Sequence, residues 1–309
     1  MVYVLLGGTG TLGQELTRLL LEDPAAKVRV LARGEHRLNE MRREFSDDRL
    51  SFFVGDVRDR LRLRRALEGA DYVFHLAALK HVHTCEYDVL EAVRTNIDGT
   101  ANVVEACIDA GVKRSVLVST DKAVEPTTTY GATKMMAERI FIHGNSYSGG
   151  KCPEFYAVRY GNVMASQGSV LKIWKDQAEH GEPLTIVDAE MTRFWWTVGE
   201  AARFVQESMT YARPGDIYVP LLPACSLRDL AEMVAPGAKT THVDGHPMEK
   251  MHEDLISSCE LDRATYIGNG VVRLSMVLSP PVDEERFHAP RLNSGDISTP
   301  SMVAEKFAA

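Results

Sequence analysis

The first half of the chain alternates short apolar runs with segments whose apolar residues recur at helical spacing. Short apolar runs between polar turns are typical of buried strands, and helical spacing is typical of amphipathic helices. Strands are expected at residues 2–6, 28–32, 50–54, 72–77, 115–119 and 155–160. Helices are expected at residues 12–21, 36–45, 61–67, 89–110 and about 130–143. This order predicts an α/β fold in which helices cover both faces of a parallel sheet.

The rhythm breaks after Gly161, where glycine and proline residues separate shorter elements. The change predicts a second, smaller domain. We expect the larger domain to comprise residues 1–165 and about 192–218, and the smaller one to comprise about 166–191 and 219–309. The last residues, from Arg291 onward, have the composition of a loosely ordered tail.

The composition is that of a soluble globular protein, with 45% hydrophobic and 25% charged residues among 309. Lysine and arginine number 35 against 43 aspartate and glutamate, so the net charge of −8 repels nucleic acid and anionic membrane. No apolar run approaches the roughly 18 residues of a membrane span, and no signal peptide is visible at the start. We expect a cytoplasmic protein with no nucleic-acid or membrane partner.

Cysteine and histidine residues give no sign of a metal site. The five cysteines are odd in number, widely spaced and without a CxxC pair, which is typical of reduced structural thiols. His81 and His83 form an HxH pair, but no third ligand motif lies nearby. We therefore expect no bound metal.

A glycine-rich turn follows the first expected strand and opens the first expected helix. Its residues, Gly7-Gly8-Thr9-Gly10-Thr11-Leu12-Gly13, satisfy the GxGxxG pattern. Glycines in this context permit a tight turn and let backbone amides approach a pyrophosphate at the positive end of a helix. The motif predicts a Rossmann-type doubly wound sheet that binds a dinucleotide, with an unliganded glycine turn as the alternative.

The end of the second strand indicates which dinucleotide is bound. A carboxylate there would accept a hydrogen bond from an unphosphorylated ribose, whereas a cation would bind a 2′-phosphate. Arg33 and Arg37 are both in reach and no carboxylate sits at the tip, although Glu35 lies between them. NADP is therefore favoured over NAD, unless the arginines form only a solvated surface. Asp56, after the third strand, is placed to contact the adenine or to cap a helix.

Five residues with catalytic chemistry follow the fifth expected strand. Carboxyl ends of parallel strands face the ligand crevice, so these residues should meet there. A tyrosine four residues before a lysine lies on the same helical face. A tyrosine that acts as a base near neutrality needs its pKa lowered by about 3 units, which an ammonium and a cationic nicotinamide can supply. The five candidates are Thr120, Asp121, Lys122, Tyr130 and Lys134.

Together these features resemble the extended short-chain dehydrogenase/reductase superfamily. Within it, seven motifs in order are similar to those of the UDP-N-acetylglucosamine 4,6-dehydratases, especially the soluble inverting branch that opens pseudaminic acid biosynthesis. The similarity runs from Val2 to about Glu253, with a weaker echo at Asn293-Ser294. The motifs are GDVRD (55–59), HLAALKHV (75–82), TNIDGT (95–100), STDKAVEPTTTYGATK (119–134), RYGNV (159–163), MTRFW (191–195) and EKMHE (249–253).

The resemblance implies a redox-neutral dehydration of UDP-N-acetylglucosamine. Tyr130 would deprotonate the hydroxyl on sugar carbon 4 while Thr120 holds it and hydride passes to NADP. Lys122 would then remove the proton on carbon 5, Asp121 would protonate the departing carbon 6 hydroxyl, and hydride would return to carbon 6 with inversion at carbon 5. A basic lysine must be neutral, and we expect burial and the cations Lys80 and Lys134 to lower the pKa of Lys122.

The resemblance also implies binding residues. We expect the substrate to contact Lys80, Asn162, Val170, Arg193 and Glu249. Two departures from the family pattern, at Gln167 and His246, are expected to remove cationic contacts to the diphosphate. We expect the cofactor to contact Gly7, Thr9, Gly10, Thr11, Leu12, Gly13, Arg33, Arg37, Asp56, Val57, Leu76, Ala77, Ala78, Lys80, Tyr130, Lys134, Tyr160 and Val163.

Three alternatives stay open beside the inverting dehydratase, which we expect to be a homo-oligomer like its relatives. A retaining dehydratase often has methionine at the Tyr130 position and N-terminal membrane spans, and this chain shows neither. A nucleotide-sugar 4-epimerase would use the tyrosine and lysine but would not need the Asp121-Lys122 pair. A non-catalytic NADP-binding regulator would need only the glycine turn.

Overall fold

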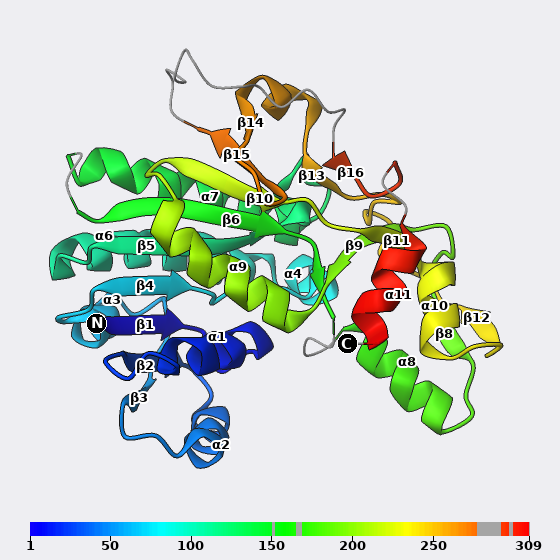
Figure 1. The fold of residues 1–309 in the computed structure, drawn as a ribbon, viewed down its shortest axis with the longest axis horizontal. Coiled ribbons are helices and arrows are strands. Elements are labelled where there is room, and N and C mark those ends of the chain that lie inside the picture. The colour runs from blue at the N-terminus through cyan, green and yellow to red at the C-terminus, as the bar shows by residue number, and fades with distance from the viewer. Residues whose placement is uncertain (150–151, 165–168, 277–291, 297–298, 309) are drawn as a thin grey trace.

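The computed structural model describes residues 1–149, 152–164, 169–276, 292–296 and 299–308. Over these residues the chain forms one large sheet with helices on both faces, and a smaller group of elements lies beyond one end of the sheet (Figure 1). The predicted α/β class, with a doubly wound sheet, is therefore confirmed.

The strands of the large sheet lie in the order β14-β15-β10-β6-β5-β4-β1-β2-β3. In this spatial order, neighbouring strands from β10 across to β3 pair in parallel. β15 pairs antiparallel with β10, and β14 pairs antiparallel with β15. Their bounds are β1 Val2–Leu6, β2 Lys27–Ala32, β3 Leu50–Val54, β4 Tyr72–His75, β5 Arg114–Thr120, β6 Glu154–Tyr160, β10 Asp216–Pro220, β14 Ala264–Tyr266 and β15 Val271–Ser275.

The antiparallel edge corrects the predicted domain boundary. Residues 264–275 belong to the large sheet and not to the smaller domain, in which the sequence analysis places them. The pattern misled because an antiparallel edge strand needs no crossover helix before it, so the alternation of strand and helix stops while the sheet continues.

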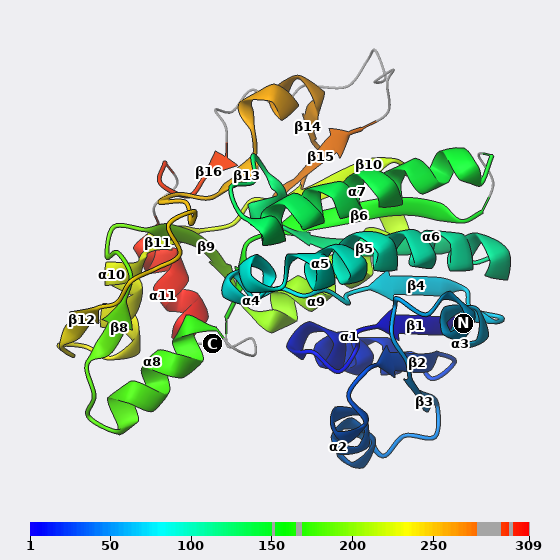
Figure 2. The same cartoon turned by 180° about the vertical axis from the view of Figure 1, so that it is seen from behind.

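Helices cover the sheet in two layers. On one face α1 (Thr11–Leu21) packs against α9 (Val198–Tyr211), and α2 (Glu35–Phe45) packs beside β2 and β3. On the other face α6 (Gly99–Ala110) packs between α3 (Arg60–Leu67) and α7 (Thr129–Tyr147), as the view from behind shows (Figure 2).

The predicted helix at 89–110 is composite. It begins as α5 (Val89–Ala92), widens into a π-helical turn, η1 (Val93–Asp98), and continues as α6. A short helix that the pattern missed, α4 (Val82–Tyr87), precedes it, and only Cys85 in α4 is buried. A helix this short and this exposed leaves little apolar periodicity in the sequence.

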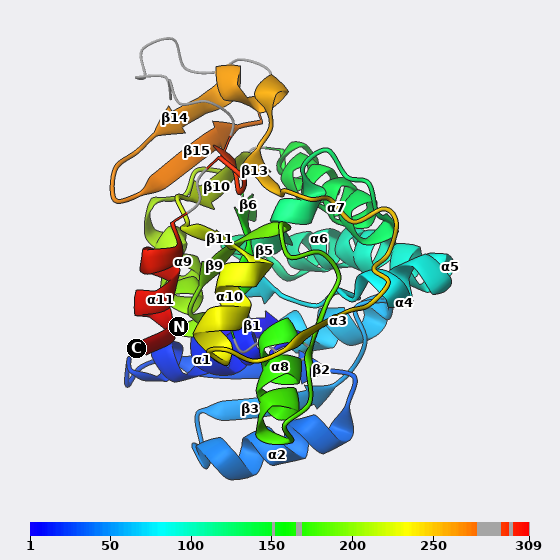
Figure 3. The same cartoon turned by 90° about the vertical axis from the view of Figure 1, so that its right-hand side faces the viewer.

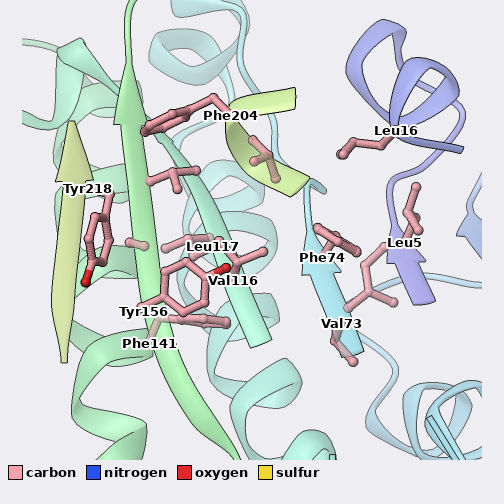
Figure 4. Packing of buried hydrophobic residues seen from close by; sticks show 14 of the residues in the cluster. Leu5, Leu16, Val73, Phe74, Val116, Leu117, Phe141, Tyr156, Phe204 and Tyr218 are labelled. Atoms are coloured by element: carbon pink, nitrogen blue, oxygen red, sulfur yellow. The ribbon is translucent and has the colours of Figure 1, made fainter. Parts of the chain in front are cut away.

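The main core lies between the sheet and its two helical layers. Figure 4 shows Phe74 and Val116 on adjacent strands, with Phe141 of α7 and Phe204 of α9 reaching the sheet from its two covering layers. Phe141 also meets Phe155 edge-to-face, with ring centroids 5.1 Å apart. Because this core is closed on both sides, the carboxyl ends of the strands are held rigidly and can position a site.

The smaller group of elements encloses a second core around Trp174, which is fully buried. Figure 3 shows three of its helices, α8, α10 and α11, lying together. Its elements are β7 Asn162–Val163, α8 Val170–Glu179, β8 Leu184–Ile186, β9 Thr192–Trp196, β11 Ala224–Ser226, α10 Leu227–Val234, β12 Thr240–His242 and α11 Pro300–Ala308. Between the two cores lie η2 Asp121–Ala123, β13 Asp254–Ile256, η3 Ser258–Arg263 and β16 Leu292–Asn293.

The expectation of a loosely ordered tail is wrong for much of residues 291–309. Leu292 and Asn293 form β16 against β13, and α11 packs on α10 and β11 with Val303 fully buried in the second core. Serine, threonine and proline before α11 look like a linker, but here they lead to and begin a helix that closes the smaller domain.

A buried guanidinium joins the sheet to the segment beyond it. Arg159 of β6 binds Glu138 of α7 through Nε and Nη2, at 3.1 and 2.9 Å. It also binds both carboxylate oxygens of Glu260 in η3 at 2.9 Å, and it donates to the carbonyl oxygen of Leu255 at 3.1 Å. One side chain therefore holds together β6, α7, β13 and η3.

The docking of α11 predicts the effect of a charge at Val303. Val303→Asp should detach the helix, because burial of an unpaired carboxylate costs several kcal/mol, about as much as one short helix can contribute. Limited proteolysis should cut the variant within residues 294–309 much faster than the wild type. Met302→Asp, at a 49% exposed neighbour, should leave the cleavage rate unchanged; equal rates in the two variants would contradict the docked helix.

Candidate active site

The glycine turn between β1 and α1 has the shape of an anion cradle. Gly7 has a φ of +83°, and a Cβ there would lie 2.8 Å from the backbone of Ala77. A Cβ on Gly13 would lie 2.4 Å from the carbonyl oxygen of Gly8, so these two positions need glycine. A Cβ on Gly10 would meet only the carbonyl oxygen of Gly7, at an ordinary contact distance of 3.6 Å, and no side chain caps the helix that follows. The open, uncapped helix start fits the pyrophosphate of a dinucleotide.

The predicted adenosine-side residues flank this cradle. Arg33 and Arg37, after β2, are exposed, as a pair that binds a 2′-phosphate must be. Asp56 accepts two hydrogen bonds from the Arg58 guanidinium and one from its amide. Burial raises the pKa of Asp56, but Arg58 and Arg33 outweigh it and hold that pKa below its usual value. Asp59, and not Asp56, caps α3, so the capping alternative for Asp56 is wrong.

Asn96 holds the loop after β4 beside α7. From η1, its amide group donates to the carbonyl oxygen of Leu79 at 2.9 Å and to Thr133 Oγ1 at 3.0 Å, and its oxygen accepts from the Leu79 amide at 2.8 Å. The predicted contacts Leu76, Ala77 and Ala78 lie in this loop. Asn96 lies within the TNIDGT motif. Its contacts with Leu79 and Thr133 depend on the π-helical turn, which the hydrophobic pattern does not reveal.

Tyr130 and Lys134 lie at the start of α7, and both are largely enclosed. Lys134 Nζ donates to the carbonyl oxygen of Val118 at 2.8 Å, and burial lowers the pKa of Lys134 to about 8 against the opposing charge of Glu138. Burial raises the pKa of Tyr130 to about 12, partly offset by Lys122 and by a hydrogen bond with Thr120. The expected lowering is thus absent in the protein by itself and would have to come from a bound cationic nicotinamide.

Asp121 and Lys122 follow Thr120 at the end of β5, in η2. Asp121 is fully buried; its Oδ1 accepts from Thr120 Oγ1 at 2.9 Å and lies 3.2 Å from Lys122 Nζ. Burial raises the pKa of Asp121, and the Lys122 charge offsets only part of that effect. A raised pKa lets a carboxyl group hold its proton to higher pH than an exposed aspartate does, which is the direction that a general acid needs.

The expected lowering of the Lys122 pKa is wrong. Burial favours the neutral amine, but the carboxylates of Asp121 and Glu253 outweigh it and raise the pKa of Lys122. Glu253 Oε1 lies 3.1 Å from Lys122 Nζ, and Arg193 is the cation that acts on it, in place of Lys80 and Lys134. The raised pKa favours the ammonium form of the resting lysine, because Asp121 beside it and Glu253, far along the sequence, both reach it.

Glu253 is the site residue that the sequence analysis missed. It closes the EKMHE motif, from which Glu249 was chosen as the contact to the substrate. The structure instead brings Glu253 to Lys122, while Glu249 is half-buried in the preceding loop. Burial raises the pKa of Glu253, but Lys122, Arg193 and Lys250 outweigh burial and hold it below its usual value. Only contact across the fold could have revealed it.

Of the other expected substrate residues, Lys80 lies in the loop after β4, and three lie in the smaller group of elements. Asn162 of β7 pairs with Trp195 of β9, and Val170 begins α8. Arg193 is buried, and its Nη1 donates to the carbonyl oxygens of Thr192 and Met251 at 2.8 and 3.1 Å. Gln167 lies outside the described residues. Their contacts with a substrate stay a prediction.

Neither a metal cluster nor a membrane span is found in the part of the chain that the structure describes. No group of three or more His, Cys, Asp or Glu side chains there is arranged to hold a metal ion. None of the helices described is both long and apolar enough to cross a membrane.

The sequence matches a known family over most of its length. The profile of the family described as "Polysaccharide biosynthesis protein" matches residues 3–273. The chain belongs to this family. The resemblance to the extended dehydrogenase/reductase superfamily, and within it to the inverting 4,6-dehydratases, is likewise confirmed.

Curated relatives cover most of the chain. It is 41% identical to an uncharacterized membrane protein of Methanocaldococcus jannaschii, over 82% of this chain and 80% of that protein. It is 39% identical to the UDP-N-acetylglucosamine 4,6-dehydratase (inverting) of Campylobacter jejuni, over 82% and 76%. It is 36% identical to the UDP-glucose 4-epimerase of Rickettsia akari, over 87% and 81%.

Solved structures share the fold. The structure of Pen from Bacillus thuringiensis superposes with a TM-score of 0.92 at 33% identity, over 99% of this chain and 98% of that one. DesIV, a dTDP-glucose 4,6-dehydratase from Streptomyces venezuelae solved with NAD, superposes with a TM-score of 0.75 at 24% identity, over 81% and 87%.

The cradle predicts opposite effects for two glycine-to-alanine changes. Gly10→Ala should leave the free energy of unfolding nearly unchanged, because its Cβ makes only an ordinary contact with the Gly7 carbonyl oxygen, but should weaken dinucleotide binding about ten- to hundredfold by blocking hydrogen bonds to a charged group. Gly13→Ala should destabilise the fold itself, because its Cβ meets the Gly8 backbone. Calorimetric titration with the dinucleotide and denaturant unfolding measure the two quantities; unweakened binding in folded Gly10→Ala would contradict the cradle.

Proposed function

We propose that this protein is an NADP-dependent UDP-N-acetylglucosamine 4,6-dehydratase that inverts carbon 5. The observation that carries the proposal is the enclosed pair Asp121 and Lys122, which meets Thr120 and Tyr130 at the carboxyl end of β5. A dehydration needs an acid for the departing hydroxyl and a base for the carbon 5 proton in addition to the redox residues. The identity to the Campylobacter dehydratase supports the same reading.

The cofactor site fits a nicotinamide dinucleotide. When bound, NADP would take a hydride from carbon 4 and return it to carbon 6. Gly7 to Gly13 would hold the pyrophosphate, and Arg33 with Arg37 would bind the 2′-phosphate. Tyr130 would accept the proton of the carbon 4 hydroxyl, which Thr120 would orient. Lys134, which donates a hydrogen bond to the backbone of β5, would add positive charge beside the Tyr130 phenol.

The later steps fall to Asp121 and Lys122. Asp121, whose pKa burial raises, would hold the proton that the carbon 6 hydroxyl needs to leave as water. Lys122 would take the proton from carbon 5, which a ketone at carbon 4 makes acidic. The nucleotide part of the substrate would lie against the smaller domain, contacting Lys80, Asn162, Val170, Arg193 and Glu249.

We also infer a homo-oligomer, because adjacent helices expose apolar side chains. Leu90 of α5 is 70% exposed, and Met136 and Tyr147 of α7 are 42% and 67% exposed. A second copy of the chain would cover them.

A 4-epimerase is the second candidate, supported by the identity to the Rickettsia enzyme. An epimerase leaves carbon 5 and carbon 6 untouched, so the buried acid and ammonium would have no step to perform. The fate of the carbon 5 hydrogen therefore separates the two functions.

The arginine pair predicts which cofactor the purified protein carries. Protein denatured after purification should release NADP in excess over NAD, because a redox-neutral cycle restores the cofactor and gains from retaining it. Substitution of Arg33 and Arg37 by alanine should reduce the preference for NADP about tenfold or more, since each loses a charged hydrogen bond. Arg43→Ala, which removes an exposed cation on the same helix as Arg37, is the matched control and should keep the preference for NADP. An excess of NAD in the wild type would refute the preference.

The chemistry is tested in deuterated water with UDP-N-acetylglucosamine. Wild-type product should carry one deuterium at carbon 5, with inverted configuration, while the hydrogen that reaches carbon 6 comes from carbon 4. Asp121→Asn should still give the absorbance of reduced cofactor but lose product by about two to four orders of magnitude, the usual range for a general acid. Tyr130→Phe should lose both signals, whereas Tyr87→Phe, 83% exposed, should lose neither.

NMR of the product decides between the candidates. Product that has lost no water and carries no deuterium at carbon 5 would replace the dehydratase by the 4-epimerase. Dehydration by Tyr130→Phe at the wild-type rate, with an unchanged melting temperature, would refute the role of the phenol.

A further inference from the structure

Lys122 is the member of the acid–base cluster that a substrate can reach. Its side chain is 20% exposed, whereas those of Asp121 and Glu253 are 0% and 4% exposed. The lysine also bridges the two carboxyl groups, with Nζ 3.2 Å from Asp121 Oδ1 and 3.1 Å from Glu253 Oε1. Any action of Glu253 on a sugar must therefore pass through Lys122.

Glu253 is held in place from both sides of its backbone. Its amide donates to Ser294 Oγ at 2.9 Å, and its carbonyl oxygen accepts from the Ser294 amide at 2.8 Å. Ser294 is fixed in turn by Thr192, whose hydroxyl lies 2.8 Å from Ser294 Oγ and 2.8 Å from His252 Nδ1. These buried hydrogen bonds fix the backbone from which the Glu253 side chain reaches Lys122.

Each carboxyl group near Lys122 keeps one buried oxygen without a partner. Asp121 Oδ2 and Glu253 Oε2 make no hydrogen bond within the described residues. A buried carboxylate oxygen without a partner is costly, whereas the neutral acid removes most of that cost. Each group therefore has a buried oxygen on which a proton could sit, and at Glu253 the neighbouring cations oppose that protonation in the resting site.

We propose that Glu253 is a positioning residue that accepts the proton of Lys122, and so leaves the neutral amine that removal of the carbon 5 proton requires. This inference rests on the proposed dehydratase function and adds a residue to it. Glu253 does not touch the sugar; it prepares the residue that does.

The protons balance over the step. An N–H bond of the Lys122 ammonium breaks and an O–H bond forms on Glu253, which turns an ion pair into a neutral amine and a neutral acid. The amine then takes the carbon 5 proton, the C–H electron pair forms the double bond, and the carbon 6 hydroxyl leaves as water with the Asp121 proton. Lys122 then passes a proton to Asp121 and receives the one on Glu253, which restores the starting charges.

Substrate binding favours this transfer. A bound sugar covers the exposed part of Lys122, and an ion pair loses more than a neutral pair when water is excluded. The surrounding charges oppose the transfer in the resting site, because Arg193 and Lys250 stabilise the Glu253 carboxylate and Asp121 stabilises the Lys122 ammonium. The exclusion of water by the bound sugar must outweigh them.

A passive partner would behave in the opposite way. If Glu253 only stabilised the ammonium by its charge, its neutralisation would make Lys122 lose a proton more easily. Carbon 5 chemistry would then persist in Glu253→Gln and extend to lower pH. If Glu253 accepts the Lys122 proton, Glu253→Gln should not remove the carbon 5 proton near neutrality. It should regain this activity only at higher pH, where solvent can take the proton from Lys122.

The experiment follows carbon 5 exchange in deuterated water with the holoenzyme and UDP-N-acetylglucosamine, across pH, beside the appearance of reduced cofactor. Glu253→Gln should form reduced cofactor as the wild type does, and lose carbon 5 exchange by about a hundredfold or more near neutrality. Glu253→Asp, which keeps a carboxylate, should retain more exchange than the glutamine variant. Glu207→Gln, an exposed glutamate on α9, is the matched control.

The outcomes distinguish failure of the role proposed for Glu253 from failure of the proposed dehydratase function. Glu253→Gln contradicts the role of Glu253 as proton acceptor if it exchanges the carbon 5 hydrogen at the wild-type rate. A pH profile of that exchange shifted to lower pH would contradict it too. Equal losses in Glu253→Gln and Glu253→Asp would make the residue purely structural and overturn it as well. A wild-type enzyme that reduces its cofactor but never exchanges carbon 5 would instead overturn the dehydratase.

Discussion

The buried guanidinium of Arg159 is the interaction on which the arrangement of the site depends. It contacts two carboxylates and one carbonyl oxygen, so its charge is matched without water. Glu138, one of its partners, lies one turn beyond Lys134 on α7, and Glu260 lies seven residues beyond Glu253. A buried ion pair of this kind adds little net stability, but the loss of one partner would leave a charge stranded in the core. Arg159 thus fixes where α7 and the Glu253 segment meet.

The parts of the fold with regular alternation could be predicted from the sequence. The strands at 2–6 and 50–54 agree with the structure residue for residue, because each is a short, mainly apolar run that ends at a glycine turn. The pattern failed where the reason for a structure lies elsewhere in the chain. The strand at Val271–Ser275 exists because β10 offers it an edge, and α11 is ordered because the second core receives Val303.

The candidate site divides in the same way. Gly7, Gly13, Thr120, Tyr130 and Lys134 lie next to elements whose ends the sequence reveals, and their neighbours along the chain define their surroundings. Glu253 and Asn96 act on residues more than ten positions away, across a loop or a domain. The Lys122 pKa follows this rule only in part: the neighbouring Asp121 is the larger of the two charges that raise it, and the other, Glu253, is 131 positions later, the difference between 253 and 122.

The contact between Ser294 and Glu253 has a consequence for the order in which the molecule is made. A growing chain releases the glycine turn, β5 and α7 well before residue 294, and neighbouring parallel strands can pair as they emerge. The first 160 or so residues can thus assemble a dinucleotide cradle while the acid–base cluster still lacks its second carboxylate. Synthesis of the last tenth of the chain therefore supplies the serine that holds the Glu253 backbone beside Lys122.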